Sequence, residues 1–238
     1  MSENIKKITK AFKVDLDSRE NQSIILKPSA RPFNNQTHQV NEVTKKIAEK
    51  IYKLIEGAKH PNDDIILNHN EIKEVFFSPF EPQLKDAKVF LSHSHADKNK
   101  ALEVKNYLES ETNHRVFIDS LFWDYKNNIL KEMKKHHIDV SKIKDAFTLI
   151  LRESLQDMIE KCPYFVFLQS NNSVSCNQDL SCITYSAWIY EELKIAHSIR
   201  ESRPTPMMES WQVFHNISPF LESLETITLS KLSHIINS

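Results

Sequence analysis

Residues 88–125 read KVFLSHSHADKNKALEVKNYLESETNHRVFIDSLFWDY, and they predict a strand, a polar turn, a helix, a second strand and an aromatic loop. The run Val89, Phe90, Leu91 is fully apolar and short, as expected of a strand buried on both faces of a parallel sheet. Polar side chains follow it at once, at the carboxyl edge where open α/β sheets bind ligands. These polar residues are Ser92, His93, Ser94, His95 and Asp97.

The pattern of strand and helix continues beyond this stretch. Asp97 is placed to cap a helix that presents Ala101, Val104 and Leu108 to the sheet. The later elements are a strand at 115–119, the aromatic loop at 121–125, helices at 142–161 and 185–199 and a strand at 164–168, with candidate strands at 211–214 and 227–229 and a last helix at 229–236. Alternating strands and helices predict an α/β fold with a doubly wound parallel sheet.

The N-terminal part reads differently. Residues 1–38 mix charged, Asn, Ser and Pro residues without periodicity, which predicts a loosely ordered arm without a functional role. A helix is expected from Val40, with Gly57 at its C-terminal cap, and a shorter apolar stretch spans 65–77. We therefore expect an N-terminal arm and helical extension over 1–84 and the main domain over 85–238.

Composition excludes several classes of protein. The formal net charge of -1 is evenly spread, so no segment resembles a nucleic-acid surface. The chain has one glycine, which excludes a P-loop and a dinucleotide fingerprint. Neither a signal peptide nor a membrane span is evident, which predicts a cytoplasmic protein with no membrane partner. The three cysteines form no C-x-x-C pair and are expected to be buried thiols, with no metal held.

Glu192 is the most informative single residue. On a helical wheel, Trp188 and Ile195 lie to one side of it and Leu193 and Ala196 to the other, so this carboxylate occupies the apolar stripe. Glutamate is rarely buried unless it is paired or functional. A ligand cleft explains the position, and so does a salt bridge to Arg115 or to a lysine.

Four segments resemble TIR (Toll/interleukin-1 receptor) domains, over about residues 84–199. KVFLSHSHADKNKALEVKNYL is similar to their first strand and helix, RVFIDS with FWDY to the second strand and BB loop, and YFVFLQSNNSVS to the third strand. YSAWIYEEL resembles the tryptophan-containing helix that carries the catalytic glutamate of NAD-cleaving TIR domains, which falls on Glu192. An insertion at 131–141 and Ile189, in place of a frequent cysteine, depart from the pattern.

The resemblance implies a flavodoxin-like sheet and a hydrolase (NADase) activity. It implies cleavage of the nicotinamide–ribose bond of NAD+, as substrate and with no further cofactor, giving ADP-ribose, a cyclised variant or a transferred ADP-ribosyl group. Bacterial stand-alone relatives act in antiviral defence by depleting NAD+ or by nucleotide signalling to an effector protein, and they self-associate into oligomers. Glu192 would be catalytic, and the substrate-binding residues would be Ser92, His93, Ser94, His95, Asp97, Asp119, Trp123, Tyr125 and Trp188.

Other interpretations remain open at this point. Many TIR domains are adaptors without catalysis, although an adaptor has no need for a glutamate on the buried stripe. His93, His95 and Asp97 form an H-x-H-x-D string that resembles the zinc motif of metallo-β-lactamase-fold hydrolases. Against zinc, Lys98 stands where that family has another histidine. Trp123 and Trp188 could be core residues, and Asp97 could be only a helix cap.

Overall fold

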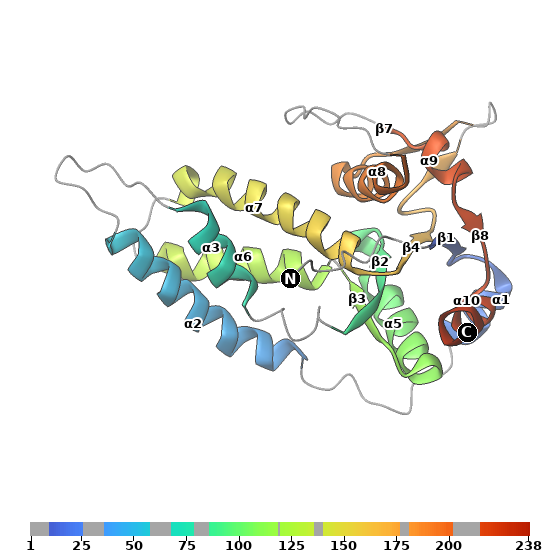
Figure 1. Ribbon diagram of the computed structural model, residues 1–238, viewed down its shortest axis with the longest axis horizontal. Helices are drawn as coiled ribbons and strands as arrows, with labels where there is room; N and C mark the ends of the chain where they lie inside the picture. Colours follow the sequence, from blue (N-terminus) through green and yellow to red (C-terminus); the bar gives the residue numbers. More distant parts are fainter. Residues whose placement is uncertain are drawn as a thin grey trace, which may run out of the picture. The chain divides into compact units, whose positions relative to one another are not determined.

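The structure is a computed structural model of the 238-residue chain, and it divides into two compact units that are described separately (Figure 1). The sheet unit comprises Met1–Ala30, Asp86–Asp119 and Gln156–Ser238, and the helical unit comprises Arg31–Lys85 and Ser120–Leu155. The residues described are 10–25, 36–57, 68–78, 86–118, 120–135, 140–176, 181–201 and 215–238.

The sheet unit is built on a five-stranded sheet with the order β3-β2-β4-β1-β8, in which neighbouring strands pair in parallel. Its strands are β1 (Lys10–Asp15), β2 (Ala87–Ser92), β3 (Arg115–Ile118), β4 (Tyr164–Gln169) and β8 (Glu225–Thr226). Helices flank the sheet, which confirms the doubly wound α/β fold. Phe90 of β2 lies between residues of the two neighbouring strands, with its ring stacked 5.7 Å from that of Phe117 and 5.9 Å from that of Phe165.

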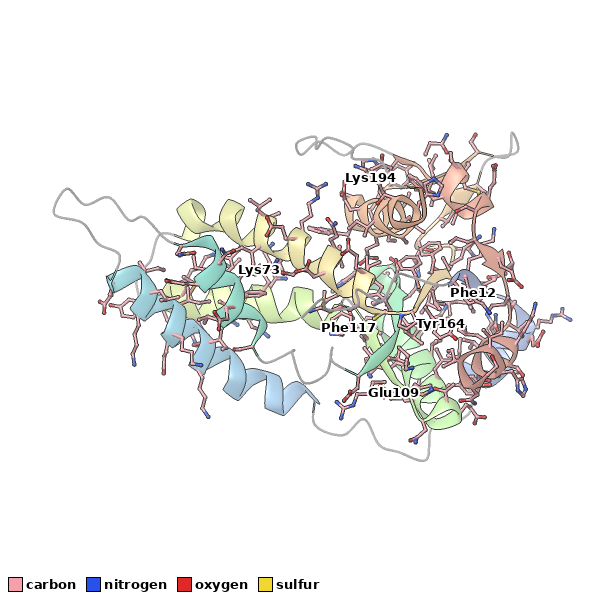
Figure 2. The ribbon with its side chains drawn as sticks, in the orientation of Figure 1. Phe12, Lys73, Glu109, Phe117, Tyr164 and Lys194 are labelled. Carbon is pink, nitrogen blue, oxygen red and sulfur yellow. A yellow bond between two sulfur atoms is a disulfide. The ribbon has the colours of Figure 1, made fainter. Side chains whose placement is uncertain are left out.

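Strand β1 was not expected. The sequence KAFKVDL places Phe12, Val14 and Leu16 on alternate positions, and all three side chains are buried (Figure 2 labels Phe12). Phe12 pairs with Val166, so β1 is an interior strand beside β4. The prediction of a loose arm is therefore wrong for residues 10–25, which form β1 and α1.

Helices cover both faces of this sheet (Figure 1). Helices α1, α5 and α10 gather on one face, and α8 lies on the other. The buried Asn21 joins two elements, because its Nδ2 donates to the Asp15 carbonyl at 2.7 Å and its Oδ1 accepts from the Leu229 N–H at 2.9 Å. The helices of the sheet unit are α1 (Arg19–Ile25), η1 (His95–Asp97), α5 (Lys98–Thr112), α8 (Ala187–Glu201), α9 (Ser218–Glu222) and α10 (Leu229–Asn237).

The outer edge of β3 is covered by side chains of α5. Glu109 accepts a hydrogen bond from the Val116 N–H at 2.9 Å, and Lys105 donates to the Val116 carbonyl at 2.7 Å (Figure 2 labels Glu109). Lys105 and Glu109 also pair with each other. Between α5 and β3, Asn113 adopts the left-handed conformation (φ 53°) that glycine usually supplies after a helix.

The helix expected from Val40 to Gly57 is present, but the unit that contains it also includes Ser120–Leu155, which the sequence analysis assigned to the main domain. Helices α2 (Gln36–Gly57) and α3 (His69–Phe77) pack in it with α6 (Ser120–Lys135) and the first part of α7 (Val140–Lys161). Phe76 contacts Phe147 with ring centroids 5.5 Å apart, and Lys73 pairs with Glu153 at 3.6 Å. Buried residues at helical spacing form the core: Ile47, Ile51, Ile55, Ile72, Ile129, Met133, Ile150 and Leu151.

Two sequence predictions are wrong, one for the segment after β3 and one for the segment after β8. The aromatic loop at 121–125 is instead part of α6, because no glycine or proline interrupts the stretch from Ser120 to Lys135. The candidate strand at 227–229 is also wrong, since Thr228 caps α10 by accepting from the Lys231 N–H at 3.2 Å. The helix expected at 229–236 is confirmed by α10, and the candidate strand at 211–214 lies outside the described residues.

A small antiparallel sheet precedes and follows α8. It contains β5 (Ser175–Cys176), β6 (Cys182–Thr184) and β7 (His215–Asn216) in the order β5-β6-β7. Cys176 and Cys182 form a disulfide, so the prediction of buried thiols is right only for Cys162. Burial raises the pKa of the Cys162 thiol to about 12.

In the part of the chain that is described, no helix is both long and apolar enough to cross a membrane.

Candidate active site

The topology of the sheet singles out one position along its carboxyl edge, between β2 and β4. The chain leaves β2 through α5 toward β3 on one side, whereas it leaves β4 toward β8 on the other side. Connections that depart in opposite directions from neighbouring parallel strands open a space between them, and ligands of α/β proteins bind there. Side chains at the ends of β2 and β4 are therefore the first candidates for a site.

Ser92 and Glu192 meet at this edge. Ser92 is the last residue of β2 and is fully buried, and its Oγ donates a hydrogen bond to Oε2 of Glu192. Glu192 lies in the second turn of α8 and has an exposed fraction of 0%. A carboxyl group is thus held inside the protein, directly above the strand end that the fold marks as a binding edge.

The neighbours of Glu192 on α8 are as the helical wheel predicts. Ile189, Leu193 and Ala196 are each about 1% exposed, so the stripe of α8 beside Glu192 is apolar and buried. Glu191 lies on the partly exposed side of α8, where its carboxylate is 3.5 Å from the Lys194 ammonium. Two adjacent glutamates therefore occupy different environments, and only Glu192 faces the sheet.

The salt bridge to Arg115 is not supported. Arg115 is exposed and begins β3, where it pairs with Ala87 at the amino end of β2. Ser92 and Glu192 lie at the opposite, carboxyl end of β2. Arg115 is therefore at the wrong edge of the sheet to pair with Glu192.

Asp97 lies at the same edge but is bound differently. It occupies the N-cap position of α5 and makes no side-chain cap hydrogen bond. Instead, its carboxylate accepts from Ser170 Oγ and from Asn172 Nδ2, the latter at 2.8 Å. The expected cap is thus a link between the segment after β2 and the segment after β4.

Asp17 extends this link to the segment after β1. Its carboxylate accepts from the Asn171 N–H at 3.0 Å and pairs with the Lys100 ammonium at 3.2 Å, while Lys100 also lies 3.9 Å from Asp97. The Asn171 N–H, opposed by partial burial and supported by Lys100, lowers the pKa of Asp17 below its usual value. Sequence reasoning missed Asp17 and Lys100, although the alternation in residues 10–16 was a signal for the strand that places Asp17.

The predicted site residues differ in how deeply they are buried and in the unit to which they belong. His93 is buried next to Ser92, Ser94 is half-buried and His95 is exposed. Trp188 is half-buried on α8, one turn before Glu192. Of the other three predicted residues, Asp119 lies outside the described residues, and Trp123 and Tyr125 lie on α6 of the helical unit, where only their backbone is described.

The H-x-H-x-D string does not assemble a metal site. His93 is buried, His95 is exposed, and the carboxylate of Asp97 is engaged by Ser170 and Asn172. Among all the described side chains, no three His, Cys, Asp or Glu residues gather as zinc ligands would. These residues therefore do not fit the zinc-hydrolase interpretation.

The geometry can be compared with known proteins. No family model, no curated protein and no solved structure matches this chain. What the site does must therefore be argued from its own residues.

Proposed function

We propose that this protein cleaves the nicotinamide–ribose bond of NAD+ and that Glu192 is its catalytic carboxylate. The observation that carries the proposal is the full burial of Glu192 against Ser92 at the carboxyl end of β2. A carboxyl group is costly to bury, and active sites are where proteins most often accept that cost. The TIR resemblance of residues 185–193 supports the same residue on independent grounds.

The chemistry suits a site with one carboxylate. When the bond between C1′ of the ribose and the pyridinium nitrogen breaks, its electron pair neutralises the ring, so nicotinamide leaves without needing a proton. The ribosyl group develops the positive charge of an oxocarbenium ion, as in glycoside cleavage. Glu192 would stabilise that charge, with Ser92 orienting the carboxylate. Water that attacks C1′ and loses a proton gives ADP-ribose, and an internal acceptor gives a cyclised product.

Access to the carboxylate is the next requirement. Because Glu192 has no exposed surface, NAD+ reaches it only after side chains around α8 rearrange. Trp188, half-buried one turn earlier, is placed to contact a ring of the substrate once the site is open. Self-association, which the TIR resemblance implies, is one way to favour the open arrangement.

Nicotinamide release by the purified protein tests this proposal. The protein is incubated at high concentration with NAD+, and the adenine-containing product is identified by mass. We expect Glu192→Gln to lower the rate by about 10²-fold or more, because it removes the charge that stabilises the transition state. Glu191→Gln is the matched control, since it changes the adjacent residue on the exposed side of α8, and it should keep the wild-type rate.

Two results would contradict the proposal. If Glu192→Gln released nicotinamide at the wild-type rate, Glu192 would not be the catalytic residue, and the activity would belong to another site. No release by the wild-type protein over the whole concentration range would favour the adaptor interpretation, in which the sheet unit is an assembly module.

A further inference from the structure

The disulfide lies in the segment that connects β4 to α8. Cys176 of β5 and Cys182 of β6 are direct partners in the antiparallel register, and the only other pair in this ladder is Ser175 with Ile183. A two-residue pairing of this kind is marginal by itself. Residues 177–181 connect β5 to β6 along the chain, and the bond between the two sulfur atoms adds a second covalent link that fixes the two strands against each other.

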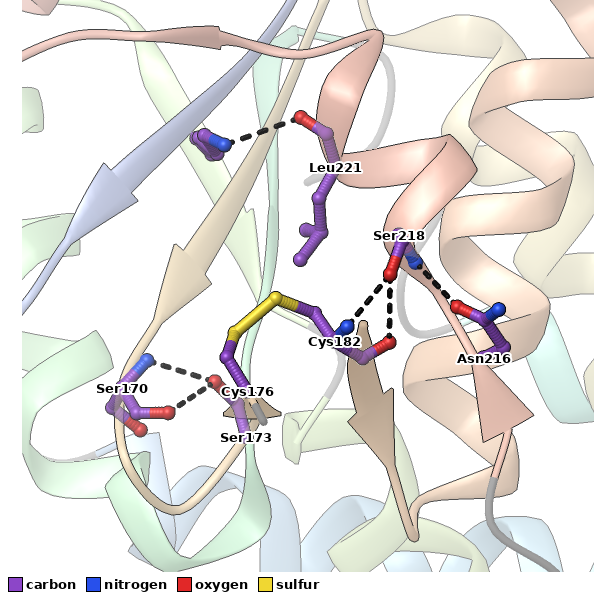
Figure 3. Close-up of a disulfide and its surroundings, with 8 residues drawn as sticks. Ser170, Ser173, Cys176, Cys182, Asn216, Ser218 and Leu221 are labelled. Carbon is purple, nitrogen blue, oxygen red and sulfur yellow. Dashed lines mark hydrogen bonds between the residues drawn. A yellow bond between two sulfur atoms is a disulfide. The ribbon is translucent and has the colours of Figure 1, made fainter. Parts of the chain in front are cut away.

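On the β6 side, Cys182 is fixed to the segment after β7. The Cys182 carbonyl accepts from the Ile217 N–H at 2.9 Å. The Cys182 N–H donates to Ser218 Oγ at 2.6 Å, as Figure 3 shows. Thr184, the last residue of β6, pairs with His215. Strand β6 is thus held between the disulfide on one side and β7 on the other.

On the β5 side, the disulfide connects to the end of β4. The N–H groups of Ser173 and Val174 donate to the Ser170 carbonyl at 3.1 and 3.0 Å, and Ser170 binds Asp97 (Figure 3 shows Ser170 and Ser173). Cys176 follows directly after this turn. The sulfur bridge therefore joins β6 to the turn that carries the partners of Asp97.

Helix α8 begins immediately after β6. Thr184 Oγ1 accepts from the Ser186 N–H at 3.2 Å, and Ser186 Oγ accepts from the Ile189 N–H at 3.3 Å, so the first turn of α8 is tied to the end of β6. Glu192 lies in the next turn. Any displacement of β6 relative to the end of β4 would move the start of α8 and, with it, Glu192 relative to Ser92.

We propose that the Cys176–Cys182 disulfide is a redox latch that holds α8 in the closed arrangement and that its reduction opens the Glu192 site. This inference rests on the proposed function, because it assigns a control to the same carboxylate. In the oxidised protein, β6 is fixed to the turn after β4, and Glu192 stays buried against Ser92. Reduction leaves the two-residue pairing and the connecting residues 177–181 between β5 and β6, and this looser connection allows α8 to shift.

The reductant implied is a dithiol. One of its thiolates attacks a sulfur of the pair and breaks the disulfide, giving a mixed disulfide and a cysteine thiolate that takes up a proton. The second thiol then displaces the other cysteine, so the reductant leaves as a disulfide and the protein carries two thiols. Cys176 is exposed, and its sulfur is the accessible point of attack, whereas Cys162 is fully buried.

Thiol counting tests the covalent part of the latch. The denatured protein should show one reactive thiol, Cys162, without reduction and three after reduction. The native protein treated with a small dithiol should gain two reactive thiols, while Cys162 stays protected. Three thiols in the denatured protein after purification and treatment with an oxidant would overturn the proposal, because the pair would then not form.

Fluorescence tests the movement of α8 without any substrate. In a Trp123→Phe/Trp211→Phe background, Trp188 is the only tryptophan. We expect reduction, or Cys176→Ser/Cys182→Ser, to change the Trp188 emission maximum and its quenching by acrylamide, and reoxidation of the reduced protein to reverse the change. Cys162→Ala is the control and should retain the redox response. Unchanged Trp188 emission in both the reduced protein and the double variant would overturn the latch.

Measuring nicotinamide release with and without reduction tests whether the disulfide controls the Glu192 site. Nicotinamide release by the wild-type protein is expected to rise about tenfold on reduction, a change within the range usual for coupling between sites. The double variant should be active without a dithiol. A Trp188 response without any release in either state would support the latch and contradict the proposed function. Equal release in both states, with unchanged Trp188 emission, would contradict the latch and leave the proposed function standing.

Discussion

Two carboxylates lie at the same edge of the same sheet, and their surroundings differ. Asp97 accepts from Ser170 and Asn172, and Lys100 lies 3.9 Å away. Glu192 accepts from Ser92, while its neighbours on α8 are apolar. Both side chains are almost completely buried, with exposed fractions of 2% for Asp97 and 0% for Glu192.

Under the proposed function, the difference separates a structural role for Asp97 from a chemical role for Glu192. Asp97 joins the segments after β2 and β4, so its carboxylate acts within the scaffold. Glu192 lies fully buried on the apolar stripe of α8, and the proposed function assigns its carboxylate to the chemistry. The free energies of unfolding of Asp97→Ala and Glu192→Gln test this difference between the two carboxylates.

The largest effect is expected for Asp97→Ala. Removing the carboxylate leaves the buried Ser170 hydroxyl without its acceptor and breaks the link between β2 and β4. The free energy of unfolding should fall by about 2 kcal/mol, as is usual when a buried hydrogen-bonding group loses its partner. Urea denaturation followed by circular dichroism measures it. A change below about 0.5 kcal/mol, the range of ordinary surface substitutions, would show that Asp97 is no scaffold residue.

Glu192→Gln is expected to change stability in the opposite direction. The amide oxygen can still accept from Ser92, and the variant replaces a fully buried carboxyl group with a neutral amide. The free energy of unfolding should therefore rise by about 1 kcal/mol. Glu191→Gln, which alters an ion pair on the partly exposed side, should stay within about 0.5 kcal/mol of the wild type. If Glu192→Gln were destabilising like Asp97→Ala, the two carboxylates would share a scaffold role.

The smallest effect is expected for Asp17 and depends on pH. Its pKa is lowered in the folded protein, so its contribution is fully present above the unfolded value of 3.8 and is lost as the pH falls through the folded pKa. Asp17→Asn can still accept from Asn171 but does not titrate. Urea denaturation at pH 7 should show a loss below about 1 kcal/mol, because the Lys100 pair is partly exposed.

The wild type and Asp17→Asn should therefore converge in stability as the pH falls below 3.8. A difference between them that stays constant from pH 7 to pH 3 would show that the charge on Asp17 contributes nothing.

The sequence alone predicts the elements whose periodicity is strong. The apolar runs of β2 and β4 predict the parallel sheet. The apolar stripe of α8 predicts the burial of Glu192. Strand β1 was missed because Lys10, Lys13 and Asp15 give residues 10–16 a polar composition, although Phe12 and Val14 alternate with them. The charged residues hid the alternation of apolar and polar side chains, although this alternation is sufficient for a strand beside β4.

The interactions between distant segments were the hardest to predict. The Asp17–Lys100–Asp97 network joins residues that are far apart in the sequence, and their meeting depends on β1 lying next to β4. The pairing of Cys176 with Cys182 likewise depends on the register of β5 and β6, which a polar loop does not reveal. The helical course of residues 121–125 was obscured because their aromatic composition resembles a TIR loop.

The side chains along β3 limit how copies of this protein could assemble. An edge strand normally offers its free N–H and C=O groups to a strand of another molecule. In β3, Glu109 and Lys105 already occupy both groups of Val116, so a foreign strand would have to displace a buried lysine to pair there. Copies that assemble at this edge of the sheet would therefore contact each other through side chains, and such contacts can dissociate. They would not add strand to strand into one continuous intermolecular sheet.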